Sequence, residues 1–448
     1  MSKYLIVGII LVVLVALLAT NKKLVETLKN IYKIEELRKR ILFTLGLLLV
    51  YRLGSFVTLP GVNHAALEAF TQSFADDNSL MGLLNVFSGG AFSQASIFAL
   101  GVMPYITASI IIQLLGIMVP YFRKMQREGE SGRRKMNQWT RFLTIAVLLL
   151  QAPAYLKSTV MRYNAVSMGE DTFIYTSTII LIAGTMFIMW LGEKITDKGI
   201  GNGVSLIIMI GIVARLPHAF LEELMFQVSA SGSIIMLIVE LVFLAMVFML
   251  AIAIVQAVRK IPVQYAKRIV GNKQYGGVRQ YIPLKLNAAN VMPIIFAQAL
   301  MFIPGLIWGG QWLDITSFWY NFTLAALVIA FTYFYTAIIV NPQMMADDMK
   351  RNGGFIPGVK PGKSTVTYID NIMTRITLPG SIFLAIITVL PAIAMTIGIS
   401  QGFAYFFGGT SLLIMVGVVL DTLKQIESYL LMRHYDGLMK TGRIQGRY

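Results

Sequence analysis

The chain alternates between long apolar runs and short polar connections that are mostly basic. Ten of the apolar runs come close to the roughly 20 residues that a helix needs to cross the hydrocarbon core. A segment that contacts lipid must be helical, because only a helix satisfies its own backbone hydrogen bonds there. The predicted spans are residues 42–58, 102–119, 138–156, 173–191, 203–216, 233–256, 291–308, 322–340, 376–397 and 405–425. The pattern therefore predicts an all-α polytopic membrane protein with ten transmembrane helices.

Composition agrees with this class and excludes several functions. Of 448 residues 56% are hydrophobic and 13% are charged, with a mean hydropathy of +0.69. A soluble chain of this length would need more charge to cover its surface. The absence of cysteine excludes disulfides, thiol catalysis and thiolate metal sites. The three histidines are far apart in the sequence, so we expect no metal centre, no cofactor and no catalytic triad.

Basic residues are concentrated in alternate connections. The segments that hold them are 21–40, 120–141, 192–202, 256–290, 341–375 and 424–448, with 33 of the 38 Lys and Arg. Connections rich in Lys and Arg stay in the cytoplasm. We therefore predict a multi-pass protein of the bacterial plasma membrane, with both ends of the ten-helix core in the cytoplasm and a cytoplasmic tail over 427–448.

Two segments precede the predicted core. Residues 1–21 contain a 16-residue apolar run after a single Lys3. This run is either an extra membrane helix whose N-terminus lies outside, or a processed or extraneous segment. Residues 22–40 carry apolar positions at spacings of three and four beside a basic face. That spacing predicts an amphipathic helix along the cytoplasmic membrane surface, although an ordinary solvated helix would have the same pattern.

Two basic connections are too long to be simple linkers. In residues 256–290, "IPVQYAKRIV" and "VRQYIPLKL" flank a Gly-rich turn, which predicts a β-hairpin. Residues 341–375 are rich in Gly and Pro. We predict that both loops bind an acidic or anionic partner, although positive charge could also serve topology alone. The candidate contacts are Arg259, Lys260, Lys267, Arg268, Lys273 and Lys360.

One apolar stretch is too short to span. A helix over residues 87–100 would reach about 21 Å, less than the roughly 30 Å of a hydrocarbon core. The stretch begins with a Gly-Gly pair, carries polar residues and is followed by Gly101 and Pro104, which separate it from the next helix. We predict a half-helix that enters a watery vestibule from the external side. A permanent re-entrant strut is the alternative.

The predicted membrane interior holds few groups for chemistry. "PGKST" at 361–365 lacks the first glycine of a phosphate loop, so no nucleotide site is expected. Glu240 is the one acid well inside a predicted span, and it either pairs with a partner subunit or a facing polar group, or serves as a proton site. Isolated amide and hydroxyl groups could form a seam that opens reversibly. The candidates for this seam are Thr107, Gln113, Asn290 and Gln298.

Several stretches together resemble one family. They include "NVFSGGAFSQASIFALGVMPYITASIIIQLL" at 85–115, "EGESGRRK" at 128–135 and "GTMFIMWLGEKITDKGIGNGVSLII" at 184–208. The others lie at 265–271, 282–297, 355–377 and 407–421. In this order they are similar to the SecY/Sec61-alpha family of protein-conducting channels. The likeness covers about residues 22 to 440.

The resemblance implies two five-helix halves, 41–216 and 233–426, joined by an external hinge at 217–232. It implies a central pore with an apolar ring, a plug and a lateral gate between the second and third and the seventh and eighth helices. The ring residues would be Val102, Ile106, Ile208, Ile295, Ala299 and Ile414. The plug residues would be Phe87, Ser88, Gly89, Gly90, Ser93, Gln94 and Ser96. The function implied is passage of unfolded polypeptides across the membrane and sideways release of apolar segments into lipid.

The partners implied are SecE, SecG, the SecA ATPase, the ribosome, unfolded preproteins with their signal peptides, membrane lipids and also SecDF and YidC. An ATPase or ribosome would supply the energy, so the chain itself is not expected to be an enzyme.

Branched apolar side chains suit a ring that dewets and resists ions, and Ala299 is small for this role. The sequence departs from the family in its N-terminal run, in Glu240 and in Lys360, where bacterial members typically carry Arg, whose planar fork a lysine lacks.

Two other functions compete with a channel. A secondary solute transporter would also have broken helices, but it predicts several polar groups at the midplane. A membrane-embedded enzyme such as an intramembrane protease requires a paired catalytic constellation, and the sequence offers none.

Overall fold

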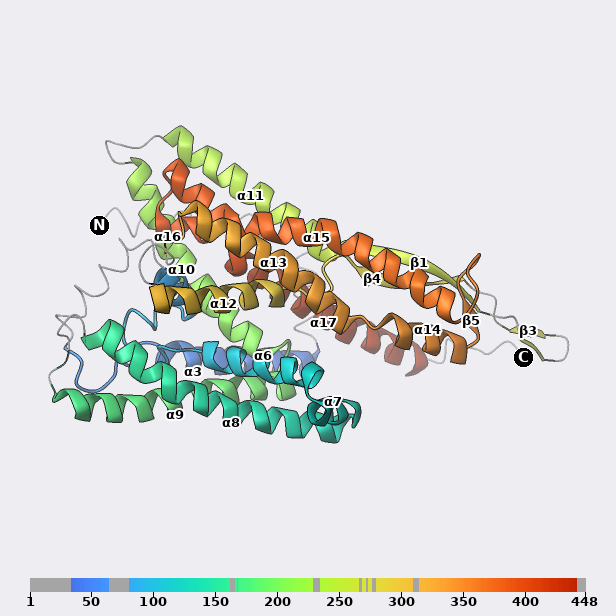
Figure 1. Ribbon diagram of the computed structural model, residues 1–448, viewed down its shortest axis with the longest axis horizontal. Coiled ribbons are helices and arrows are strands. Elements are labelled where there is room, and N and C mark those ends of the chain that lie inside the picture. The colour runs from blue at the N-terminus through green and yellow to red at the C-terminus, as the bar shows by residue number, and fades with distance from the viewer. Residues whose placement is uncertain are drawn as a thin grey trace. The chain divides into compact units, whose positions relative to one another are not determined.

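The computed structural model describes residues 34–63, 80–161, 166, 168–228, 234–265, 268–270, 273–275, 279–308 and 314–440. The N-terminal run 1–21 and most of the predicted amphipathic segment lie outside these residues. The described chain is mainly helical (Figure 1). Its long helices are α3 (Glu35–Gly54), α6 (Met103–Met118), α8 (Glu130–Tyr155), α9 (Glu170–Lys198), α10 (Gly203–Val228), α11 (Ile234–Gln256), α12 (Met292–Trp308), α13 (Phe318–Ile339), α15 (Lys363–Ile397) and α17 (Gly409–Lys440).

Each of these ten helices overlaps one of the ten predicted spans. Within the described residues, six helices are long and apolar enough to cross a membrane, and a seventh span arises if α6 and α7 (Pro120–Arg127), which meet at a bend of 100°, are counted as one. Pro120 and the extended backbone of Val119 cause this bend. The multi-pass class is therefore confirmed, whereas the count of ten spans stays a prediction.

Helix ends differ from the predicted ends where polar residues continue a helix beyond the apolar run. α3 already begins at Glu35, so the end of the predicted surface helix is part of the first span. α10 passes through Pro217 as far as Val228, so most of the predicted hinge is helical. α15 begins at Lys363 and α17 extends to Lys440, within stretches predicted as a loop and a tail. Hydropathy sets where a helix can cross lipid, not where it ends.

The chain forms two compact units. The first consists of residues 1–53, 189–207 and 418–448. Within it, the turn between α9 and α10 is held by side chains: Ile200 N–H donates to Thr44 Oγ1 at 3.1 Å, and Gly201 N–H donates to Gln425 Oε1 at 2.8 Å. The unit boundaries cut across single helices and so do not test the two halves predicted from the resemblance.

The second unit, residues 54–188 and 208–417, holds every candidate ring, plug and gate residue. It also contains shorter elements: α5 (Leu80–Phe87), the π-helix η1 (Leu156–Val160), α14 (Pro342–Arg351) and α16 (Gln401–Ala404). η1 continues α8 just after Pro153, which removes one backbone donor from that helix.

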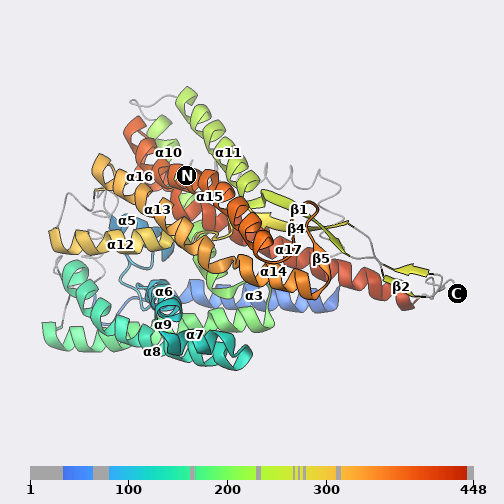
Figure 2. The same cartoon turned by 45° about the vertical axis from the view of Figure 1, so that its right-hand side comes forward.

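The two long basic connections fold together into one sheet lobe, made of β1, β4, β5, α14 and the first turns of α15. β1 (Val258–Tyr265) pairs antiparallel with β4 (Arg279–Lys285), so the predicted hairpin is confirmed. β5 (Gly354–Phe355), from the second connection, pairs with the other edge of β1. Figure 1 and Figure 2 show this sheet beside α14 and the start of α15. At the tip, β2 (Arg268–Val270) pairs with β3 (Lys273–Tyr275).

The sheet lobe has its own apolar core. Alternate residues of β1 point into it, which is the period expected of a strand with one buried face. The buried members are Ile261, Val263, Leu284, Met349, Ile356, Ile369 and Met373. The lobe is therefore an ordered structure rather than a pair of loops.

Candidate functional site

The segment between α5 and α6 is not the half-helix that its length suggested. α5 ends at Phe87, and residues 88–102 form consecutive turns. Gly89 and Gly90 have φ of +66° and +93°, and Ala95 has φ of +44°, values that end a right-handed helix. The prediction of a helix over 87–100 was wrong, because these left-handed residues interrupt it.

Backbone turns satisfy most N–H groups of this segment, and polar side chains accept from the others. Ser93 N–H donates to Asn85 Oδ1 at 3.1 Å, and Phe92 N–H donates to Ser88 Oγ at 3.0 Å. Phe98 N–H donates to Ser96 Oγ at 3.2 Å. Buried backbone donors need such partners wherever regular structure is absent. The predicted plug serines thus hold their own segment together.

The same segment is tied to two neighbouring elements. Leu59 N–H donates to the Ala95 carbonyl and Ile97 N–H donates to the Val57 carbonyl, each at 2.9 Å. These bonds flank an antiparallel bridge between Thr58 and Ser96. From the other side, Tyr155 Oη donates to the Phe92 carbonyl at 2.8 Å. The segment therefore sits between residues 57–59 and the end of α8.

The walls of this segment, α9 and α10, approach its backbone closely at two glycines. A Cβ at Gly211 of α10 would lie 2.8 Å from the Phe87 carbonyl oxygen, and a Cβ at Gly184 of α9 would overlap the Ile97 carbonyl oxygen. Ser93 and Ser96 are 2% and 0% exposed. The prediction that these serines face a watery vestibule is therefore wrong. Gln94 is half-buried, and the other predicted plug residues are buried.

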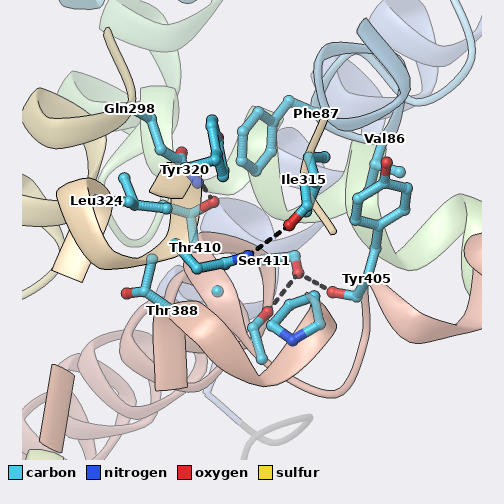
Figure 3. A pocket seen from close by; sticks show the side chains of 14 residues that line it. Val86, Phe87, Gln298, Ile315, Tyr320, Leu324, Thr388, Tyr405, Thr410 and Ser411 are labelled. Carbon is cyan, nitrogen blue, oxygen red and sulfur yellow. Dashed lines mark hydrogen bonds between the residues drawn. The ribbon is translucent and has the colours of Figure 1, made fainter. Parts of the chain in front are cut away.

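A small pocket opens where α5 ends. Figure 3 shows Phe87 beside the side chains of α12, α13 and the start of α17 that share this pocket. Ser411 Oγ donates to the Tyr405 and Gly408 carbonyls, and Thr410 Oγ1 donates to Gln298 Oε1 at 3.3 Å. Tyr320 Oη, in the same pocket, has no hydrogen-bond partner among the described residues.

The predicted ring residues lie on four helices or at their ends. Val102 precedes α6 and Ile414 lies on α17, and each is 6% exposed. Ile106 and Ile295 are partly buried and pack against one apolar cluster, formed by Ile110, Ala289, Phe296 and Tyr335. Ile208 is half-buried on α10. Ala299 lies on α12, but its side chain is outside the described residues.

That apolar cluster marks a seam between α6, α12 and α13. Across the seam, Tyr335 Oη donates to Gln113 Oε1 at 3.0 Å, and the rings of Phe296 and Tyr335 lie 4.9 Å apart. Of the four seam candidates, only Gln113 makes a contact of this kind. Thr107 donates to the Met103 carbonyl of its own helix, and Gln298 pairs with α17.

Asn290, the fourth candidate, lies exposed in the turn before α12, with a φ of +52° that asparagine tolerates better than most residues. It thus lies in a turn, before α12 begins. Sequence reasoning missed Tyr335, Tyr155 and Asn85. An amide or a tyrosine within an apolar helix was the only signal that could have suggested them.

The basic candidates lie on the sheet lobe. Arg259 and Lys260 are exposed on β1, and Lys360 is exposed in the turn before α15. Arg268 and Lys273 belong to the small strands at the tip, and Lys267 lies outside the described residues. The lobe thus gives these charges an ordered base from which a partner could be bound.

Glu240 is buried in a polar contact within the chain. Gln227 Nε2 donates to Glu240 Oε1 at 2.9 Å and also to Glu223 Oε1 at 2.9 Å. The reading that Glu240 pairs with a facing polar group is therefore confirmed. Within the described residues, no group of three or more His, Cys, Asp or Glu could hold a metal ion.

Comparisons with known proteins agree with this arrangement. The family model of SecY matches residues 96–423. The "Protein translocase subunit SecY" of Streptomyces coelicolor is 43% identical over 434 residues, covering 91% of this chain and 98% of that protein. The protein of the same name from Chlamydia trachomatis is 40% identical over 457 residues, covering 94% and 99%.

Solved structures share the fold at lower identity. "The structure of a protein conducting channel" has a TM-score of 0.59 at 18% identity and covers 87% of this chain and 91% of that chain. The idle yeast Ssh1 complex bound to the 80S ribosome has a TM-score of 0.58 at 14% identity, with 86% and 89% covered.

The fold and its buried turn segment thus define a multi-pass membrane protein of the protein-conducting channel class. The chain belongs to the SecY family. It is a channel subunit and not an enzyme, so the solute transporter and the intramembrane protease are both excluded.

Proposed function

We propose that the chain, as the central channel subunit of the Sec translocase, is held closed by residues 88–102 and opens when they leave their glycine-lined walls. The observation that carries this proposal is the pairing of the segment with residues 57–59 through two backbone hydrogen bonds and one bridge. A few such bonds can break and form again as one step. A related structure is described as that of a SecY protein whose plug domain stabilises the closed state and maintains a membrane seal.

The ring and the gate complete the proposed channel. Val102, Ile106, Ile208, Ile295, Ala299 and Ile414 would form the apolar constriction. The seam that joins Gln113 to Tyr335 would be the lateral gate, since one interhelical hydrogen bond in a membrane contributes only about 0.6 kcal/mol and can open reversibly. Thr107, Asn290 and Gln298 would line the gate without closing it.

The larger assembly remains part of the proposal. Ten spans in two halves, 41–216 and 233–426, would open about 217–232, with both core ends in the bacterial cytoplasm. SecE and SecG would be the membrane partners. The sheet lobe would bind the SecA ATPase or the ribosome, and ribosome-bound relatives of this fold support the second partner. Preproteins with their signal peptides, membrane lipids, SecDF and YidC are further proposed partners.

A disulfide tests whether the segment must move. The chain has no cysteine, so the pair Thr58→Cys and Ser96→Cys would be its only thiols. Opposed residues of an antiparallel bridge lie about 4.5–5.5 Å apart, a distance that a disulfide can span. Under oxidising conditions we expect preprotein transport into vesicles to stop, and a reductant should restore it.

The matched control is a disulfide between opposed residues of the sheet lobe. Pro262 faces Tyr281 across β1 and β4, so Pro262→Cys with Tyr281→Cys should close without stopping transport. If the oxidised Thr58→Cys, Ser96→Cys channel transported preprotein undiminished, residues 88–102 would be a permanent strut and the plug assignment would be wrong.

A charge reversal tests the docking surface. Arg268→Glu with Lys273→Glu should weaken ribosome or SecA binding and leave membrane insertion unchanged, because the phosphate or carboxylate contacts would be lost. The same reversal of Lys157 and Arg162, outside the lobe, is the control. If both double variants lost the same amount of binding in a titration, the effect would not depend on where the charges lie.

A further inference from the structure

Two buried carboxyl groups meet where the end of α10 faces the start of α11, in the helical hairpin that these two helices form. Glu223, near the end of α10, is 0% exposed, and Glu240, in the second turn of α11, is 2% exposed. Gln227 stands between them and is 5% exposed. Its single amide nitrogen donates to both acids, at 2.9 Å each, so both of its N–H groups are used.

The Oε2 atoms of the two acids differ in their hydrogen bonding. Glu223 Oε2 accepts the backbone N–H of Ser400 at 2.8 Å, whereas Glu240 Oε2 is buried without a hydrogen-bond partner among the described residues. Because one Gln227 nitrogen donates to both acids, their Oε1 atoms lie close together. An ionised oxygen left without a donor in such a place is strongly unfavourable. A protonated Glu240 removes that charge and gains a donor facing Glu223.

No cation among the described residues faces the pair to neutralise it. α11 carries no other ionisable residue, and neither do residues 376–404 of α15, α16 and the connection between them. On α10, Glu222 is exposed and its Oε1 lies 3.2 Å from Nδ1 of exposed His218, while Arg215 is eight residues before Glu223, about 12 Å along the helix.

The elements around the pair are packed by aromatic rings. Phe220 of α10 lies 6.0 Å from Phe403 of α16, and Phe243 of α11 lies 5.9 Å from Phe407. Tyr405, the remaining titratable side chain on this wall, accepts a hydrogen bond from Gln401. The pair is therefore enclosed by α10, α11 and the α15–α16 connection, and any charge on it acts on all three.

We propose that Glu223 and Glu240 form a buried proton-binding site in which one proton, carried by Glu240, is shared with the Glu223 carboxylate. Two carboxyl groups that accept from one nitrogen are too close together to ionise readily at the same time, so the folded protein keeps a proton that separate, solvated glutamates would release. Loss of that proton places two negative charges side by side and pushes α11 away from α10. The site lies at the end of the hairpin opposite the basic connections, and the channel function proposed above does not require it.

The direction of the pH effect follows from proton counting. Because the folded state binds more protons than the unfolded state, its stability falls as pH rises from mildly acid to mildly alkaline values. Glu240→Gln keeps the shape and supplies amide N–H donors without a titratable proton. We therefore expect this variant to lose that pH dependence and to melt a few degrees above the unmodified protein at alkaline pH.

Infrared spectroscopy tests the proton directly in the intact, detergent-solubilised protein. At neutral pH the unmodified protein should have the carbonyl band of a buried protonated carboxyl group, and Glu240→Gln should lack it. Glu222→Gln, which changes the exposed neighbour, is the control and should leave both the band and the pH profile unchanged. Glu223→Gln is the second variant and should also flatten the melting profile, since Glu240 would lose its anionic neighbour.

Two outcomes would overturn the proposal. One is a missing carboxyl band in the unmodified protein at neutral pH, or a melting profile with the same pH dependence in Glu240→Gln. The other is a melting temperature that rises with added calcium or sodium in the unmodified protein but not in Glu240→Gln, which would assign the site to a metal cation. Either outcome leaves the channel function untouched, because neither measurement involves transport.

Discussion

Residues 88–102 and the sheet lobe satisfy their backbones in opposite ways. In the lobe, β1 pairs with β4 over seven opposed residues, and an apolar core lies beneath the strands. In the turn segment, most backbone N–H groups donate to carbonyls three to five residues back, and single bonds go to the side chains of Asn85, Ser88 and Ser96 and to residues 57–59. The first arrangement is cooperative, whereas the second is a set of separate, short-range contacts.

The turn segment is where this protein can change shape at low energy. A regular sheet must break many bonds together before it moves. A buried segment without regular structure can exchange a few bonds, and at Gly184 and Gly211 its walls present backbone rather than side chains. Elsewhere Phe92 and Ala95 pack in an apolar cluster with Tyr155, which holds the closed state. The predictions below test this contrast by disturbing first the lobe, then the turn segment and finally the seam.

The largest effect should come from the core of the lobe. Ile356, 1% exposed, packs between the sheet and α15, and Ile356→Ala should destabilise the lobe by about 2–5 kcal/mol through lost burial and a cavity. Hydrogen exchange should rise over the whole of β1, β4 and α14 at once. Tyr281→Ala, at a 56% exposed site, is the control, and faster exchange limited to β5 would contradict the cooperative lobe.

The next effect concerns a wall of the turn segment. Gly184→Ala places a methyl group on the Ile97 carbonyl and should cost about 1–3 kcal/mol, since neither backbone can yield freely. We expect a lower melting temperature and a resting ion conductance in planar bilayers. Gly417→Ala on α17 is the matched control, because a Cβ there meets nothing within 4 Å. A tight, stable Gly184→Ala channel would refute the close backbone approach.

A smaller effect should come from one hydrogen bond that holds residues 88–102 in place. Tyr155→Phe removes the hydroxyl that donates to the Phe92 carbonyl, at about 0.5–1.5 kcal/mol. Resting conductance should rise modestly, while hydrogen exchange in the sheet lobe stays unchanged. If exchange in the lobe rose as well, the two regions would not be separate as described.

The smallest effect should appear at the seam. Tyr335→Phe removes the hydrogen bond to Gln113 but keeps the ring contact with Phe296, so the loss is about 0.6 kcal/mol. We expect nearly unchanged stability but easier sideways release of weakly apolar segments, measured by insertion of a graded series of test helices. Gln113→Leu should act in the same direction. An unchanged insertion threshold in both variants would remove this bond from the gate.

The sequence predicted best what depends on local pattern. Apolar length located a helix at each predicted span, and alternation in "IPVQYAKRIV" indicated the hairpin of β1 and β4. β5 was missed because two residues in a Gly- and Pro-rich loop carry no periodicity. The half-helix failed for a different reason: left-handed Gly89, Gly90 and Ala95 interrupt it, and the walls that accommodate the resulting turns approach at Gly184 and Gly211, about a hundred residues further along the chain. No local pattern links such distant positions.

α15 joins regions that are otherwise described separately. Its 35 residues extend for about 52 Å as one helix. Ile369, near one end, belongs to the core of the sheet lobe, and Thr388 and Pro391, toward the other, line the pocket beside Phe87. Pro379, between them, removes a backbone donor and softens the rod at that point. α15 is thus one continuous helix with a point at which it bends more easily, and we expect a force applied to the lobe to tilt its other end beside Phe87.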